Sequence, residues 1–283
     1  MYRRLLFLFF IILFLSCENY GKLDVLATLP IELEEVSGIE KIHNSDLIWM
    51  LNDSGNKPVI YGVDTNGVVI REVKVKAKNN DWEDITSDAQ GNLYIADFGN
   101  NNNKRKNLSV LKIKYEDLIS KDEVSVEKIK FSYPVQKKFP PKKRDRFFDA
   151  ESLIFANNFL YFFTKSRVKN EYGKTTLYRI PASKGNYEAT FISNFETCSD
   201  LHCWITAAAI SPDKKKVVLL NHQSVYVLKY FKNDDFFSGS ITELPLHHIS
   251  QKESITFKDN NTVYITDEKA HLKGGRLYEV SLK

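Results

Sequence analysis

Three glutamates stand at the start of apolar segments that lie far apart in the chain. Glu83 begins "EDITS", Glu151 begins "ESLIF" and Glu253 begins "ESITF". A buried carboxylate is costly unless a cation or hydrogen-bond donors compensate its charge. If the three segments come together, the carboxylates would repel one another and would require a shared cation. Oxygen ligands without histidine or cysteine suit Ca²⁺ better than Zn²⁺, so the pattern predicts a calcium site.

The same glutamates have a second interpretation that needs no ion. Each could turn aside to cap loop backbone or to pair with a neighbouring lysine or arginine, because structural ion pairs are common in proteins. The sequence leaves this alternative open.

The glutamates belong to an internal repeat. Five units align, and each contains short segments rich in β-branched and aromatic residues, which predicts four strands per unit. The first strands align at Ser37, Glu83, Glu151, Ala208 and Glu253, and the ends of the second strands align at Asp53, Asp97, Lys165, His222 and Asp267. The interval between the two positions is sixteen residues in the first unit and fourteen in the other four. Units of four antiparallel strands are typical of a β-propeller, so we predict an all-β fold.

We predict five blades in a single domain over residues 23–283. The fifth unit lacks its fourth strand, and the segment "LDVLATLPI" at 23–31 can supply it. This closure would protect the strand edges and tie the two ends of the domain together. Six blades are the nearest alternative because the interval before Glu151 is long, but its prolines and charges favour the loop "PVQKKFPPKKRDRFFD". A β-sandwich or barrel is a further alternative.

In a propeller the first strand of every blade lines the central channel, and the residues that begin these strands meet at one mouth. Glu83, Glu151 and Glu253 would then hold one axial Ca²⁺. Ser37 can add a hydroxyl or carbonyl oxygen, the backbone near Ala208 can add a carbonyl, and waters can complete the coordination.

The order Ser, Glu, Glu, small residue, Glu, carried by "SGI", "WED", "AES", "AAA" and "KES", resembles the calcium-activated nucleotidase (apyrase) family. The resemblance implies a five-bladed propeller with one axial Ca²⁺ held by serine and glutamate residues at the starts of inner strands. It covers the repeat framework across most of residues 23–283. Ala208 departs from it, because a hydroxyl is expected there. The segments "LNDSGNKPVIY" and "NNDWEDI" also resemble uncharacterised bacterial exported propeller lipoproteins.

A set of loop residues is expected on the metal-bearing face, where it would bind a ligand: Asn52, Asp53, Trp82, Asp97, Lys165, Arg167, His222 and Asp267. The basic runs "NKRK" and "KKRDR" would add a positive rim, which together with the ion would attract an anion such as a phosphate. Simpler interpretations stay open. The basic runs could be solvated loops, and the aspartates could cap turns. His222 could be an ordinary surface residue, and Trp82 could belong to the core.

The amino-terminal residues predict export. Residues 1–16 place two arginines ahead of an apolar run that is too short to span a bilayer comfortably, which is typical of a signal peptide. The run ends in "FLSC", which resembles a bacterial lipobox and implies lipid attachment to Cys17, with residues 17–22 as a tether. A plain secretory signal or a tethering helix is the alternative. We therefore expect a lipid-anchored protein of the bacterial cell envelope, either periplasmic or surface-facing.

Export leaves Cys198 and Cys203 as an even pair in an oxidising compartment, and we expect a disulfide between them. A Cys-x4-Cys zinc half-site is the competing interpretation, but no second pair of soft ligands accompanies it.

Two classes of function are compatible with these features. The formal net charge of +4 over 283 residues is too small to argue for nucleic-acid binding, and P-loop, G-x-G-x-x-G and G-x-S-x-G motifs are absent. We predict a monomeric cell-envelope module that binds an anionic small molecule or an envelope protein while Ca²⁺ staples the blades. The alternative is a Ca²⁺-dependent hydrolase of a phosphoester, nucleotide or other anionic ester.

Overall fold

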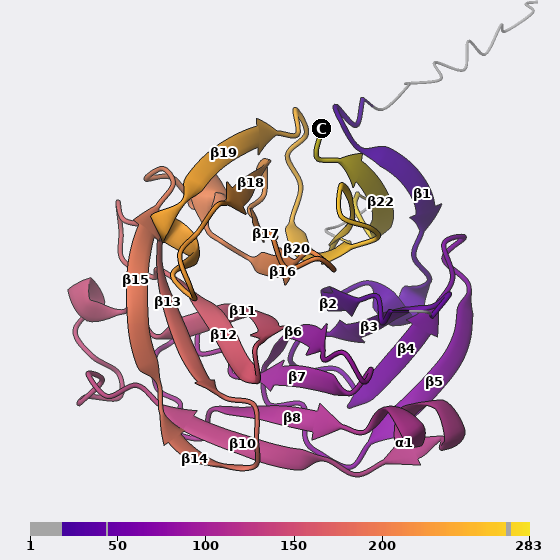
Figure 1. Cartoon of the computed structure of the whole chain (residues 1–283), viewed down its shortest axis with the longest axis horizontal. Coiled ribbons are helices and arrows are strands. Elements are labelled where there is room, and N and C mark those ends of the chain that lie inside the picture. Colours follow the sequence, from indigo (N-terminus) through magenta and orange to yellow (C-terminus); the bar gives the residue numbers. More distant parts are fainter. Residues whose placement is uncertain (1–18, 44, 270–272) are drawn as a thin grey trace, which may run out of the picture.

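The computed structural model describes residues 19–43, 45–269 and 273–283, and nearly all of their regular secondary structure is β-strand. The strands form five sheets arranged in a ring around a central axis (Figure 1). The fold is therefore a five-bladed β-propeller, as predicted, and the six-bladed alternative is wrong. Among the described helices, none is long and apolar enough to cross a membrane.

Each of the first four blades takes its four main strands from one continuous stretch of chain, ordered from the axis outward. Blade 1 contains β2 (Val36–Glu40), β3 (Ile48–Asn52), β4 (Val59–Val63) and β5 (Val69–Val75). Blade 2 contains β6 (Trp82–Ser87), β7 (Leu93–Asp97), β8 (Ser109–Ile113) and β10 (Glu127–Ser132). Blade 3 contains β11 (Asp149–Ala156), β12 (Phe159–Lys165), β13 (Lys174–Pro181) and β15 (Thr190–Glu196). Blade 4 contains β16 (Ala207–Ile210), β17 (Lys216–Leu220), β18 (Ser224–Lys229) and β19 (Ser240–Pro245).

The fifth blade is closed by the amino-terminal strand, as predicted. It contains β20 (Lys252–Phe257), β21 (Thr262–Asp267), β22 (Arg276–Ser281) and, outermost, β1 (Asp24–Thr28). β1 pairs antiparallel with β22, with Asp24 opposite Glu279. The sheet thus joins both ends of the domain, and β1 covers the edge of β22 that would otherwise be free to pair with another chain.

Two short strands cover the outer edges of blades 1 and 2. β9 (Glu123–Val124) pairs parallel with β5, and β14 (Gly185–Glu188) pairs parallel with β10. The only α-helix in the described chain is α1 (Tyr115–Ser120), and the short 3-10 helices are Ile31–Leu33, Lys143–Asp145, Leu201–Cys203 and Phe236–Ser238. The long interval between β10 and β11 contains one of these 3-10 turns and no strand. Its excess length is therefore a loop, as the prolines predicted.

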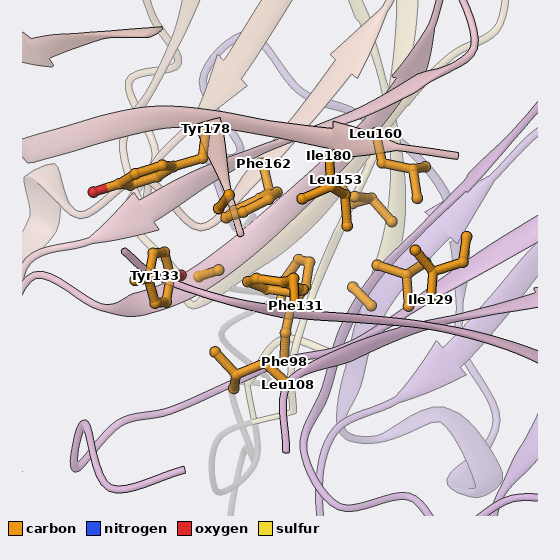
Figure 2. Close-up of a cluster of buried hydrophobic side chains, with 14 of the residues drawn as sticks. Phe98, Leu108, Ile129, Phe131, Tyr133, Leu153, Leu160, Phe162, Tyr178 and Ile180 are labelled. Carbon is orange, nitrogen blue, oxygen red and sulfur yellow. The ribbon is translucent and has the colours of Figure 1, made fainter. Parts of the chain in front are cut away.

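The hydrophobic core lies between the blades. Blades 2 and 3 enclose the aromatic cluster in Figure 2, where the ring centroids of Phe131 and Phe162 are 4.7 Å apart. Phe98, Phe162 and Leu160 are fully buried. Burial of such a side chain stabilises the fold by about 1.5–3 kcal/mol, so these contacts hold the inner strands in fixed positions around the axis.

The predicted signal peptide, residues 1–16, and the predicted lipid-attachment residue, Cys17, lie outside the described residues. Export and lipidation therefore stay predictions.

Candidate metal and ligand site at the mouth of the axis

The innermost strands of the five blades begin at one end of the axis, and their first residues line a pocket of about 490 Å³. We call this pocket the acidic mouth. It brings together the four residues predicted as metal ligands, Ser37, Glu83, Glu151 and Glu253. The four side chains line the same pocket, although the partners differ from one glutamate to the next.

Irregular strand pairing aims these side chains at the axis. The register between the first and second strands shifts between Val36 and Gly38, between Ala150 and Ser152, and between Lys252 and Ser254. Ser37, Glu151 and Glu253 are thus the extra residues of β-bulges, and Glu83 lies in the corresponding interval of β6. A bulge turns one side chain out of the regular alternation, which explains why an acidic residue can begin a buried strand.

Blade 4 contributes Thr206 to the acidic mouth. Thr206 Oγ1 donates to the carbonyl oxygen of Lys252 at 2.7 Å, just as Ser37 Oγ donates to that of Trp82 at 3.0 Å. Ala208 lies further along β16, opposite Leu219, and lines a different cavity. The predicted carbonyl ligand near Ala208 is therefore wrong. The interval could have identified Thr206, because sixteen residues separate Thr206 from His222, as they do Ser37 from Asp53.

Glu151 is neutralised by two cationic side chains of its own blade. Lys165 Nζ lies 2.9 Å from Glu151 Oε2, and Arg167 Nη2 lies 3.1 Å from Glu151 Oε1. Arg167 also bonds to Asp149. Burial raises the pKa of Glu151, but the attraction of Lys165 and Arg167 outweighs it and holds the pKa below its ordinary value. Glu151 thus follows the ion-pair interpretation.

Glu83 has no such compensation. Its side chain is only 8% exposed, and no hydrogen-bond donor or cation contacts its carboxylate among residues 19–43, 45–269 and 273–283. Burial raises its pKa well above the ordinary value, and the charges of Glu151 and Asp53 raise it further. A Cβ atom on Gly99 would lie 1.8 Å from Glu83 Oε1, so only glycine permits this close approach. The site therefore contains a buried carboxylate that lacks a partner.

Asp53 and Asp81 complete a cluster of carboxylates around Glu83. One oxygen of each of the three lies within 4.8 Å of the others. Burial raises the pKa of Asp53 to about 7, although the amide of Ser54 donates to it. Arg105 Nη1 is 3.9 Å from Asp81, but Arg105 lies closer to Asp97, at 2.9 Å. An all-oxygen donor set with uncompensated charge fits a hard divalent cation.

Asp81 was not among the predicted ligands. It lies in the loop before β6, where no strand periodicity identifies it, although its place beside Glu83 in "DWED" was a usable signal.

Glu253 lies beside a histidine. His222 Nε2 is 3.4 Å from Glu253 Oε1, so the structure places beside His222 an acidic side chain that sequence alone did not identify. Within the described chain His222 Nε2 makes no hydrogen bond. Glu268 also lines the acidic mouth and accepts a hydrogen bond from Gln251 at 2.7 Å. Burial, together with the nearby charges of Glu253 and Asp53, raises the pKa of Glu268 to about 8.

Four of the eight residues predicted on the ligand-binding face line the acidic mouth: Asp53, Lys165, Arg167 and His222. The other four are buried inside the blades: Asn52, Trp82, Asp97 and Asp267. Trp82 packs in the core between blades 1 and 2. Asp97 accepts from Asn80 at 2.7 Å, and Asp267 accepts from the hydroxyl of Tyr278 at 2.8 Å. These buried polar residues support the loops and do not face a ligand.

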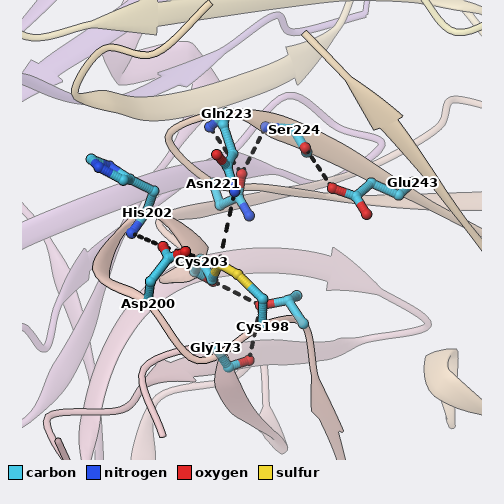
Figure 3. The surroundings of a disulfide bond; sticks show 10 residues. Gly173, Cys198, Asp200, His202, Cys203, Asn221, Gln223, Ser224 and Glu243 are labelled. Carbon is cyan, nitrogen blue, oxygen red and sulfur yellow. Dashed lines mark hydrogen bonds between the residues drawn. A yellow bond between two sulfur atoms is a disulfide. The ribbon is translucent and has the colours of Figure 1, made fainter. Parts of the chain in front are cut away.

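A disulfide (Figure 3) closes the loop that contributes Leu201 and His202 to the lining of the acidic mouth. Cys198 and Cys203 are bonded, as predicted, and their Cα atoms are 5.5 Å apart. The zinc half-site is therefore excluded in this oxidised form. The short loop that the bond closes is followed by Trp204, whose ring lies 5.1 Å from Lys165 Nζ and 5.0 Å from Arg167 Cζ. The disulfide thus anchors the segment that packs against the cationic pair.

The pocket is acidic rather than basic. Asp53, Glu83, Glu151, Glu253 and Glu268 line it against only Lys165 and Arg167. The basic runs at 103–106 and 142–146 do not contribute to the lining. Their predicted attraction for an anion therefore does not apply to the lining itself, where the surplus of carboxylates favours a cation.

No known protein-family model matches the chain, and no curated protein is similar to it in sequence. Solved structures with a similar chain path include virginiamycin B lyase from Staphylococcus aureus, with 16% identity, a TM-score of 0.43, and 90% of this chain and 69% of that chain covered. A gluconolactonase from Xanthomonas campestris has 12% identity, a TM-score of 0.47, and coverage of 93% and 89%. A chain of a nidogen/laminin complex has 11% identity, a TM-score of 0.49, and coverage of 90% and 89%. At these similarities the likeness says nothing about activity.

Proposed function

We propose that this protein is an exported binding module of the bacterial cell envelope whose acidic mouth holds Ca²⁺ between Asp53, Asp81 and Glu83. The observation that carries the proposal is the Glu83 carboxylate, which is more than nine-tenths buried and has no partner in the described chain. A divalent cation would compensate this charge and lower the raised pKa values of the cluster.

The proposed ligand set differs from three glutamates around one ion. Glu151 already accepts from Lys165 and Arg167, so a cation beside it would also meet two positive charges. Asp53 and Glu83 line the pocket on the side of blades 1 and 2, and an oxygen of Asp81 lies within 4.8 Å of theirs. Arg105 approaches Asp81 no closer than 3.9 Å. Ca²⁺ accepts irregular sets of six to eight oxygen ligands, so waters can complete the coordination. Bound there, the ion would link the loops of neighbouring blades.

A pair of matched variants tests this proposal. Ca²⁺ at a hundredfold excess over Kd should stabilise the wild-type protein by about 2.7 kcal/mol relative to chelator, measured as a rise in melting temperature. Glu83→Gln should remove most of this rise. In chelator the variant should melt at or above the wild-type temperature, because an unpaired buried charge has gone.

Glu151→Gln is the control at the equivalent position of the next blade. It leaves Lys165 and Arg167 without their partner, so it should lower the melting temperature with and without Ca²⁺. The rise produced by Ca²⁺ should persist. A rise that survives in Glu83→Gln and disappears only in Glu151→Gln would refute the proposed ligand set.

Export and lipid attachment at Cys17 are part of the proposal. The disulfide supports them, because such bonds persist in oxidising compartments. In bacteria, Cys17→Ser should move the protein from the membrane fraction to the soluble periplasm or medium. An unchanged membrane fraction would contradict the anchor.

A hydrolase remains the second candidate, and the pairing of His222 with Glu253 in the same pocket favours it. Glu253 would orient His222, which could take a proton from an attacking water. A bound Ca²⁺ would polarise an anionic ester. Turnover of a panel of nucleotides and phosphoesters in Ca²⁺, lost in chelator and in His222→Gln, would support hydrolysis. Absence of turnover in the presence of Ca²⁺ would argue against the hydrolase and in favour of the binding module.

A further inference from the structure

A second cavity, of about 310 Å³, opens at the opposite end of the axis from the acidic mouth. It is lined by the ends of the innermost strands, among them Glu40 at the end of β2 and Phe155 near the end of β11. The acidic mouth is lined by the starts of the same strands. The cavity is therefore separate from the proposed metal site, and its size is at the lower end of the range for small-molecule sites.

Small side chains of blade 4 contribute to the space in this cavity. Ala208 and Ala209 of β16 line it together with Ile85 of blade 2, Phe155 of blade 3 and Phe257 of blade 5. The lining is mixed, because these apolar residues alternate with polar and charged ones such as Ser87 and Thr256. Successive strand residues point to opposite faces, so Ala208 packs in the core toward blade 3 and Ala209 in the core toward blade 5. Their small size leaves space beside β16 in which a compact apolar group can pack.

Glu40 and Asp88 are the acidic residues that line the cavity, and Asp88 is held by Tyr94 and by the amide of Gln90. Glu40 is bound by hydroxyl groups. Its Oε1 accepts from Ser87 Oγ at 2.5 Å, and its Oε2 accepts from Thr256 Oγ1 at 2.9 Å. Within the described chain, no cationic side chain contacts this carboxylate. The nearby lysines bind elsewhere, because Lys41 Nζ donates to the carbonyl of Ser45 at 2.8 Å and Lys258 pairs with Glu279 at 2.7 Å.

We propose that this cavity binds a small organic cation, with its ammonium group on the Glu40 carboxylate and its apolar body against Ala209 and Phe155. An ammonium group offers three donors and a full positive charge. The Glu40 carboxylate interacts with the hydroxyls of Ser87 and Thr256 and with the backbone amides of Ser87 and Lys41, which are all neutral donors, so its charge has no cationic partner. A charge-assisted hydrogen bond is about twice as strong as a neutral one, which favours the ammonium over a neutral alcohol. Exposed Lys214 and His43 at the rim act on the ligand only through screened interactions.

Calorimetric titration of the full chain with phenethylammonium tests the proposal, and phenethyl alcohol is the neutral control of the same shape. The amine should bind at one site, and the alcohol should bind at least about tenfold more weakly. Glu40→Gln should weaken amine binding by a similar factor. Ala209→Leu should abolish binding because the larger side chain fills the cavity.

The rise in melting temperature caused by Ca²⁺ reports whether the variants remain folded and whether the acidic mouth is intact. It should be unchanged in Glu40→Gln and Ala209→Leu, so failure of this proposal can be told from failure of the proposed metal site. Equal affinity for amine and alcohol, no binding of the amine at millimolar concentration, or amine binding that survives Ala209→Leu would overturn the proposal. If a variant does not fold, the amine and alcohol affinities of the wild-type protein still decide.

Discussion

At the scale of the residue, the axis contains equivalent carboxylates with opposite environments. Glu83 and Glu151 begin the inner strands of neighbouring blades, yet only Glu151 has a lysine and an arginine within 3.1 Å. The residue fourteen positions after Glu151 is Lys165, whereas the residue fourteen positions after Glu83 is Asp97. This difference decides which glutamate is free to bind an ion. It can be read from the sequence only when the first and second strands are known to be paired.

Glu40→Gln should flatten the dependence of stability on pH. Burial, only partly offset by the bonds from Ser87 and Thr256, raises the folded-state pKa of Glu40 to about 7 from an ordinary 4.5. Between these values the folded protein holds a proton that the unfolded chain has released. The stability from this proton is therefore complete below about pH 4.5 and is lost as the pH rises to about 7.

Urea unfolding at several pH values checks this prediction. Between pH 4.5 and 7, the free energy of unfolding should fall by on the order of 2 kcal/mol more in the wild-type protein than in Glu40→Gln. The two proteins share the other titratable groups of the cavity, which are Lys41, His43, Asp88, Lys214 and Lys258. Parallel profiles would show that the charge of Glu40 is already compensated.

At the scale of the element, strands were predictable and local irregularities were not. The repeated apolar segments identified the inner strands because their side chains must pack between blades. A bulge shifts the strand register by one residue, and the alternation of apolar and polar residues along a strand does not reveal where it occurs. In blade 4 the alignment slipped by two positions, from Thr206 to Ala208, for another reason: the pairing is regular there, but sixteen residues rather than fourteen separate the first position from His222. The loop residue Asp81 was not predicted as a ligand, because loops carry no periodicity that would indicate where its side chain points.

The disulfide loop provides an element-scale prediction. Replacing both Cys198 and Cys203 by serine should lower the free energy of unfolding by about 2 kcal/mol, because the bond closes only a short loop. Urea unfolding of the wild-type protein in reductant should show the same loss. Detection of two free thiols at these positions by mass analysis of the non-reduced protein would contradict the bond.

At the scale of the whole molecule, closure of the ring depends on one strand contributed from the other end of the chain. The number of blades and this closure were predictable because the fifth unit lacked an outer strand. The three glutamates at the mouth were predicted, but the expected basic rim is not part of the pocket lining. The basic runs near 103–106 and 142–146 are adjacent to blades 2 and 3 in sequence, but they do not line the pocket.

Truncation tests the closure. A chain that begins at Asn19 keeps β1 and should unfold cooperatively, whereas a chain that begins at Leu29 leaves blade 5 with three strands. The shorter chain should aggregate or lose its cooperative thermal transition, because the exposed edge of β22 is unpaired. Identical transitions in the two truncated chains, followed by circular dichroism, would show that β1 is dispensable.

The central claim is the identity of the ligands that hold the cation. A crystal of the protein grown with Ca²⁺, or with a lanthanide in its place, would locate the ion directly by anomalous scattering. The account predicts one peak at the acidic mouth, bounded by carboxylate oxygens of Asp53, Asp81 and Glu83 and outside the ion pairs of Glu151. A peak equidistant from Glu83, Glu151 and Glu253, with Lys165 displaced, would contradict it, as would no peak at this mouth.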